Sequence, residues 1–189
     1  NTGIVQNLNG GVFSIGSGNA PITFPGYLSA CGAIISGVIL WENDGTSGVK
    51  NASVKLTGDT IATALTPLSG AYAFTVSTGS NFTITPTKNI NKLNGLTVAD
   101  VTAIQQHVAN IALLPAPFKR IAADVNKSNS INTLDASLIN QVLLGNPQAN
   151  AIFNTSWRFV PSSYQFLNPN VPWGFPEKIT LTGVNGLVN

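Results

Sequence analysis

The sequence predicts a mainly β protein with a small α part: a β-sandwich, a pair of loop-helix units and a β-rich tail. Residues 34–87 contain short alternating apolar segments separated by turns, which favours a sandwich. Residues 88–149 contain two apolar stripes of helical spacing, and residues 150–189 are dense in aromatic residues, Pro and Asn. Residues 1–33, rich in Gly, Asn and Ser, are expected to form an N-terminal arm or edge strand.

The composition supports a core but leaves little charge for the surface. Hydrophobic residues make up 43% of the 189 residues and charged residues only 8%, against about 25% charged residues in an ordinary soluble domain. Such a surface is weakly protected against self-association. The basic residues are scattered, so no nucleic-acid partner is expected. No apolar run approaches the roughly 18 residues of a membrane span.

Several segments alternate as half-buried strands do. In the predicted sandwich, Val54 and Leu56 alternate with polar neighbours, and turn signals such as Ser69-Gly70 separate the segments. The predicted sandwich strands cover residues 33–40, 52–58, 70–76 and 81–87. In the tail, short strands are expected at residues 156–160, 163–167 and 177–183.

Two helices are expected in the middle of the chain, because apolar residues recur there on one helical face. The first stripe follows Thr97 and comprises Val98, Val101, Ile104, Val108 and Ile111. The second follows Asn132 and comprises Leu134, Leu138, Ile139, Val142 and Leu143.

The loops before these helices form an internal repeat with an offset of 35 residues. Residues 89–100 read NINKLNGLTVAD and residues 124–135 read DVNKSNSINTLD. One interpretation is helix capping, since Thr97 to Asp100 and Asn132 to Asp135 have the spacing of a capping box. Capping leaves unexplained the polar residues that precede the second helix by several positions.

Calcium binding is the second interpretation of the loop at residues 124–135. Calcium loops supply oxygens from positions 1, 3 and 5, the carbonyl of position 7, and position 12. These positions are occupied by Asp124, Asn126, Ser128, Ser130 and Asp135. At position 6, where the loop must turn sharply, stands Asn129, a residue that tolerates the left-handed region. The spacing therefore predicts a calcium site.

The first loop is a poorer version of the same pattern. Its corresponding ligands are Asn89, Asn91, the carbonyl of Gly95, and Asp100, while position 5 is Leu93. Calcium affinity rises with the number of charged ligands. One calcium ion is therefore expected in the second loop, and a second, weaker site in the first.

The paired loops resemble a type I dockerin domain, whose repeat runs Asp-x-Asn-x-Asp-Gly-x-Ile-x-x-x-Asp before a helix. DVNKSNSINTLD matches it at positions 1, 3, 8 and 12. In dockerins, residue pairs early in the helices contact cohesin. The corresponding positions here are Val101-Thr102 and Ala136-Ser137.

A broader resemblance covers most of the chain. ISGVIL, GVKNASVKL and SGAYAF resemble a prealbumin-like, or carboxypeptidase regulatory-like, sandwich, and SWRFV resembles a strand that follows a dockerin-like pair. This order is similar to a module of large surface proteins in bacteria with type IX secretion. The resemblance implies a cell-surface or extracellular location and calcium that holds a helix pair rigid. Asp59-Thr60-Ile61 also resembles the O-glycosylation site of the same bacteria, with Thr60 as acceptor; the alternative is a turn.

No catalytic motif stands out. His107 is the only histidine, has no acid or nucleophile motif beside it, and is expected at the surface. Glu42 and Asp44 are explained by a hairpin turn. The three tryptophans suit either packing or a carbohydrate platform, and packing is favoured; they are Trp41, Trp157 and Trp173.

These observations predict a non-enzymatic extracellular structural or adhesive subunit, stiffened by calcium and self-assembling into a fibre by strand exchange. Its partners would be copies of itself or other surface proteins. The alternative is a dockerin-type binding module that tethers a larger secreted protein or hydrolase to a partner.

Overall fold

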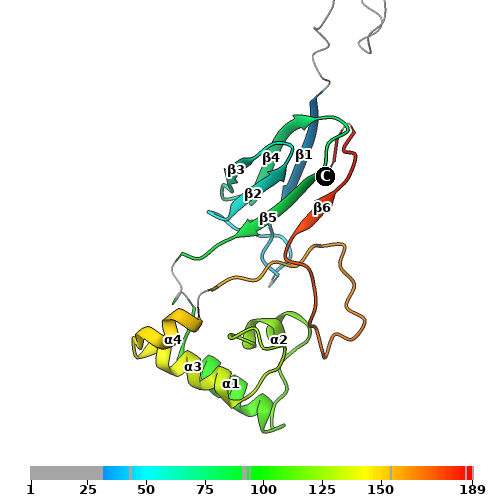
Figure 1. Cartoon of the computed structure of the whole chain (residues 1–189). Coiled ribbons are helices and arrows are strands. Elements are labelled where there is room, and N and C mark those ends of the chain that lie inside the picture. The colour runs from blue at the N-terminus through cyan, green and yellow to red at the C-terminus, as the bar shows by residue number, and fades with distance from the viewer. Residues whose placement is uncertain are drawn as a thin grey trace, which may run out of the picture.

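The computed structural model describes residues 32–42, 44–90, 93, 95–153, 155–185 and 187–188. The predicted N-terminal arm, except for its last two residues, and Asn91 lie outside the described residues. Strands occupy one end of the molecule and helices the other, and the tail returns from the helices to the sheets (Figure 1). Helices and strands contain nearly equal numbers of residues, so the protein is mixed α and β rather than mainly β.

Two sheets form the strand-rich end. In the first, β1 pairs antiparallel with β4 and parallel with β7. In the second, neighbouring strands are antiparallel in the order β3-β2-β5-β6. The strands are β1 (Gly32–Val38), β2 (Ser53–Gly58), β3 (Ala62–Leu65), β4 (Ala71–Ser77), β5 (Phe82–Thr87), β6 (Ile179–Leu181) and β7 (Leu187–Val188).

The inner faces of the two sheets share one apolar core. Val54 and Leu56 of β2 point inward, as their alternation predicts, and Leu56 pairs in register with Ile84 of β5. From the first sheet, Ile35 and Phe74 join the same buried cluster. The predicted two-sheet arrangement is therefore confirmed, and it includes β6 and β7 from the tail.

A buried threonine anchors the connection between β1 and β2, which faces the helical end. The Thr66 hydroxyl donates to the Val49 carbonyl over 2.6 Å and accepts the Ala52 amide over 2.9 Å. A side chain at Gly48 would lie 2.1 Å from the Ser69 backbone, so only glycine fits there. These contacts hold the β1–β2 connection in place.

The tail contains fewer strands than predicted. Residues 156–160 and 163–167 form no strand, and only the predicted strand at 177–183 appears, as the shorter β6. The aromatic rings pack on one another instead. The centre of the Tyr164 ring lies 5.0 Å from that of Phe166, and the centre of the Phe166 ring lies 6.3 Å from that of Phe175.

In the part of the chain that the structure describes, four helices form the other end, namely α1 (Val98–Val108), α2 (Phe118–Ala123), α3 (Thr133–Leu143) and α4 (Pro147–Ile152). The two predicted helices are confirmed as α1 and α3, which pack against each other. The six-residue helices α2 and α4 were not expected. Among the described residues, no helix has the length and apolar character needed to cross a bilayer.

The shared core predicts a large effect of Phe82→Ala. Phe82 is almost completely buried between the sheets, so its truncation should lower the free energy of unfolding by about 3–5 kcal/mol. Exposed Leu68 provides the control, and Leu68→Ala should change stability by less than about 0.5 kcal/mol. Urea denaturation measures both, and equal effects would contradict this assignment of the core.

Candidate functional site

The loop at residues 124–135 connects α2 to α3 and contains two buried carboxylates. Asp124 at the end of α2 is 3% exposed, and Asp135 in the first turn of α3 is 0% exposed. Acidic side chains are rarely so buried unless they are paired. The environment of each carboxylate therefore determines what the loop can bind.

Asp124 organises the first half of this loop. Its Oδ1 accepts the amide of Ser128 and its Oδ2 accepts the amide of Asn129, each over 2.8 Å. The chain makes this turn with two left-handed residues, Lys127 at φ 58° and Asn129 at φ 63°. The left-handed conformation expected at Asn129 is confirmed.

Asp135 closes the loop and caps the helix with one carboxylate. Its Oδ2 accepts the amide of Asn132 over 3.0 Å, which completes the predicted capping box. Its Oδ1 accepts the amide of Val125 over 3.1 Å, from the opposite side of the loop. Burial raises the pKa of Asp135, and the charge of Asp124 raises it further. Capping is thus confirmed, and the negative charge of Asp124 opposes the ionisation of Asp135.

Neutral oxygens complete the loop. Asn126 Oδ1 accepts the Ser128 amide over 2.9 Å, and the Ser128 and Ser130 hydroxyl oxygens lie 3.0 Å apart. The Ser128 hydroxyl also lies 3.4 Å from Asp124 Oδ1. Hydrogen bonds thus connect the predicted ligand residues of this loop. No group of three or more acidic, histidine or cysteine side chains gathers in the described residues, so a cation here would need the neutral oxygens as well.

The first loop is arranged differently. Asn89 Oδ1 accepts the backbone amide of Ser156 in the tail over 3.3 Å. Asp100 Oδ2 accepts the Thr97 amide over 2.7 Å and thereby caps α1. Gly95 takes a left-handed φ of 80°. Asn89 thus binds the tail, and Asp100 caps α1.

The tail segment at residues 155–157 contacts both loops and the connection between β1 and β2. Lys127 Nζ donates to Thr155 Oγ1 over 3.0 Å, and Ser156 contacts Asn89 of the first loop. The ring of Trp157 lies 6.1 Å from that of Trp41 in the β1–β2 connection. Packing is the role that the sequence favours for Trp157, and its ring contact with Trp41 agrees with that role.

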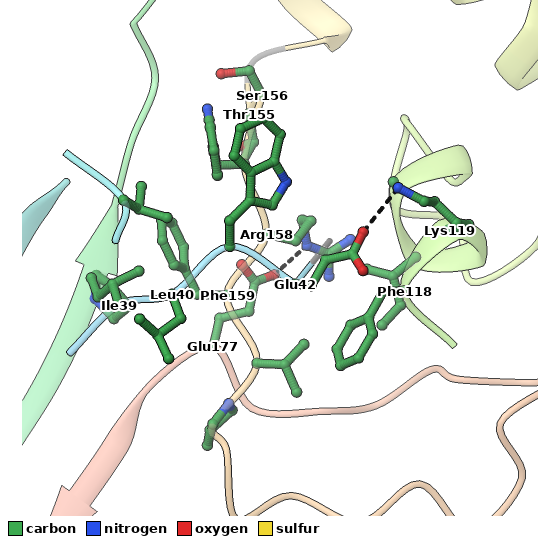
Figure 2. A pocket seen from close by; sticks show the side chains of 18 of the residues that line it. Ile39, Leu40, Glu42, Phe118, Lys119, Thr155, Ser156, Arg158, Phe159 and Glu177 are labelled. Atoms are coloured by element: carbon green, nitrogen blue, oxygen red, sulfur yellow. Dashed lines mark hydrogen bonds and ion pairs between the residues drawn. The ribbon is translucent and has the colours of Figure 1, made fainter. Parts of the chain in front are cut away.

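A cleft of about 1090 Å³ separates the strand end from the helical end. Glu42 forms an ion pair with Lys119 over 3.0 Å, and Arg158 forms one with Glu177 over 2.6 Å. Figure 2 shows Ile39, Leu40 and Phe159 on one side of these charges and Phe118 with Lys119 on the other. Sequence reasoning missed this cleft, because its walls come from distant segments of the chain.

Glu42 and Asp44 have separate roles. The Asp44 carboxylate accepts the amides of Thr46 and Ser47 over 2.9 and 2.8 Å, as the predicted turn requires. Hydrogen bonds from the Ser47 side chain and from the backbone lower the pKa of Asp44 to about 2. Glu42 instead faces the cleft, where it pairs with Lys119.

His107 is half-buried rather than fully at the surface. Its Nδ1 accepts the Leu114 amide over 3.1 Å, and the nearby Arg120 donates through Nε to the Leu114 carbonyl. Burial lowers the pKa of His107, and the charge of Arg120 lowers it further. The histidine therefore stabilises the connection between α1 and α2.

Thr60 lies exposed in the bend between β2 and β3. The carboxylate of neighbouring Asp59 accepts the Asn81 amide over 3.3 Å, and residues 59 and 60 form a bend. An exposed hydroxyl is accessible for O-glycosylation, which stays a prediction. Trp173 is half-buried in the tail.

The chain matches no protein-family model, and no curated protein or solved structure proved similar to it. The resemblance to dockerins and to prealbumin-like sandwiches therefore gains no support from these comparisons.

The environment of His107 predicts its titration. The pKa of His107 should lie below 6.5 in the folded protein, so its contribution to stability should be present at neutral pH and lost as the pH falls below 6.5. NMR titration of the single imidazole measures this value directly. Arg120→Gln should raise the pKa, whereas Lys55→Gln, on a distant strand, should leave it unchanged. A pKa above 6.5 would contradict the assigned environment.

Proposed function

We propose that the protein is a non-enzymatic extracellular structural or adhesive module that binds calcium at residues 124–135. The observation that carries this proposal is the pair of buried carboxylates, Asp124 and Asp135, on one hydrogen-bonded loop. Two like charges held close together in a buried site are unfavourable without a compensating cation. Calcium supplies that compensation.

The donor chemistry favours calcium over softer metals. The proposed ligand residues offer carboxylate, amide, hydroxyl and backbone carbonyl oxygens, which are hard donors. Neither histidine nor cysteine occurs between Asp124 and Asp135, so this loop lacks the nitrogen and sulfur donors that zinc and copper prefer. Asp124, Asn126, Ser128, Asp135 and the Ser130 carbonyl would hold the ion.

The small number of charges suits an extracellular module. Calcium affinity falls with fewer charged ligands, and extracellular modules bind at roughly 10⁻⁴ to 10⁻³ M. The loop at residues 124–135 offers two carboxylates. The resemblance to bacterial surface proteins points to the same location. The calcium ion would fix the turn that leads into α3.

Calcium titration calorimetry tests the binding site. Calcium added to the wild-type protein should produce a heat signal that fits a dissociation constant near 10⁻⁴ to 10⁻³ M. Asp124→Asn should weaken calcium binding by at least about tenfold, because it removes one of the two charged ligands. Asp100→Asn is the matched control in the first loop and should retain the binding. Absence of wild-type binding, or a loss only in Asp100→Asn, would contradict the proposal.

Calcium should also stabilise the fold. At a calcium concentration 100 times the dissociation constant, binding to the native state alone adds about 2.7 kcal/mol to the free energy of unfolding. Denaturation in calcium and in EDTA measures this difference, and Asp124→Asn should abolish most of it. Equal stability of the wild-type protein in both conditions would contradict the proposal.

The edge of the second sheet supports self-assembly as part of this function. In the described residues β3 pairs only with β2, so its other side forms a sheet edge. Leu65 on β3 is 69% exposed and Leu68 just beyond it is 76% exposed. An exposed apolar edge strand is a template for pairing with another chain.

The alternative function, a dockerin-type binding module, is less well supported. Val101 and Ala136, two of the four positions that correspond to cohesin contacts, are buried against the helical core. Their side chains are therefore not available to a partner protein.

Sedimentation velocity tests assembly. Wild-type protein should form larger species as its concentration rises, whereas Leu65→Lys should shift the equilibrium toward monomer, because a charge on an edge strand opposes pairing. Lys55→Gln, on the neighbouring β2, serves as the control. A wild-type monomer at all concentrations would contradict the proposed assembly.

A further inference from the structure

The cleft between the strands and the helices has the size and position of a ligand site. Its volume is about 1090 Å³, at the upper end of ordinary small-molecule pockets, and such sites favour the boundary between structural units. The β1–β2 connection, α2 and the tail contribute to its walls. A ligand in the cleft would therefore contact several separate segments of the chain.

The cleft gathers charge in a chain that has little of it. Glu42, Asp100, Asp124 and Glu177 are four of the seven acidic residues, and they line the cleft with four of the nine basic residues. Opposite charges thus balance along the walls. A balanced cleft offers no net attraction to a polyanion or polycation, so a neutral ligand fits best.

The charged groups are held in place by neighbouring side chains. Arg158 is fixed by its 2.6 Å contact with Glu177 and by the Phe175 ring, whose centre lies 4.9 Å from the guanidinium. A guanidinium has further donors besides Nε, and a carboxylate has two acceptor oxygens. Such planar, preorganised groups suit hydrogen bonds to neighbouring hydroxyls.

Aromatic and aliphatic surface lies beside these groups. Trp41 is 51% exposed, and Leu40 and Phe118 also line the cleft (Figure 2 labels the latter two). An exposed indole ring offers a flat apolar face. The ligand should therefore carry both an apolar face and many hydrogen-bonding groups.

The backbone of this wall is already hydrogen-bonded. Ile39 donates to Gly70 and accepts from Val49, and Trp41 donates to Ser47 and accepts from Gly45. A peptide added as a strand requires free backbone groups. Recognition at this wall therefore depends on side chains.

We propose that this cleft binds a neutral oligosaccharide, with Trp41 against the apolar face of a sugar ring and with Arg158, Glu177 and Glu42 bonding to hydroxyls. A sugar chain is uncharged, rich in hydroxyl groups and apolar on the faces of its rings, which matches each property of the walls. This proposal extends an adhesive role but does not require calcium in the loop at residues 124–135.

Titration of the full chain with cellohexaose, xylohexaose and mannohexaose tests the proposal. Tryptophan fluorescence and calorimetry should detect binding of at least one of them at millimolar concentration or below. Trp41→Ala should weaken sugar binding by at least about tenfold, whereas Trp41→Phe should retain part of the affinity that Trp41→Ala loses. Arg158→Gln should also weaken sugar binding. Trp173→Ala is the control, since Trp173 is not among the lining residues and should leave the affinity unchanged.

The outcomes separate this proposal from the calcium site. Sugar binding that persists in EDTA supports an independent sugar site, even if calcium binding fails. No binding of the three hexasaccharides, an equal loss in Trp173→Ala, or a preference for an oligogalacturonate would overturn the proposal. Tighter, Trp41-dependent binding of an uncharged hexapeptide would also overturn it.

Discussion

The helical end of this protein depends on one buried carboxylate. Asp135 accepts an amide from its own helix and another from Val125 on the far side of the loop, so it fixes the start of α3 and the loop together. The same burial that makes these hydrogen bonds effective raises the cost of its charge. A second buried carboxylate, Asp124, increases that cost. Calcium binding is the proposed way in which this end of the molecule resolves the conflict.

The tail connects the loops to the sheets. Thr155 accepts from Lys127, Ser156 contacts Asn89, and Trp157 packs against Trp41. The chain then continues to β6, which completes one sheet. The loop at residues 124–135 thus contacts the same tail segment that packs against Trp41. If calcium binds as proposed, the stiffened loop would hold this end of the molecule in a fixed shape and suit it to presenting a binding surface.

Local patterns predicted the parts of the fold that local physics controls. The stripes and caps of α1 and α3 were readable because helix periodicity and capping involve residues a few positions apart. Alternation likewise revealed β2 and β5. The tail was misread, because Tyr164 and Phe166 look like strand residues but pack against Phe175. The cleft was not predictable, since Glu42 meets Lys119 and Arg158 meets Glu177 only after folding. Its one signal in the sequence was the pair of tryptophans, Trp41 and Trp157, that line it.

Amide NMR spectra recorded during calcium addition test most directly whether calcium occupies the loop between α2 and α3. The amides of Val125, Ser128 and Asn129, which now bond to the two carboxylates, should shift together and saturate at one dissociation constant. The amides of β2 and β5 should remain unchanged. Shifts of these three amides that saturate together would support calcium binding in this loop. Unchanged amides in this loop, or shifts confined to other segments, would contradict it.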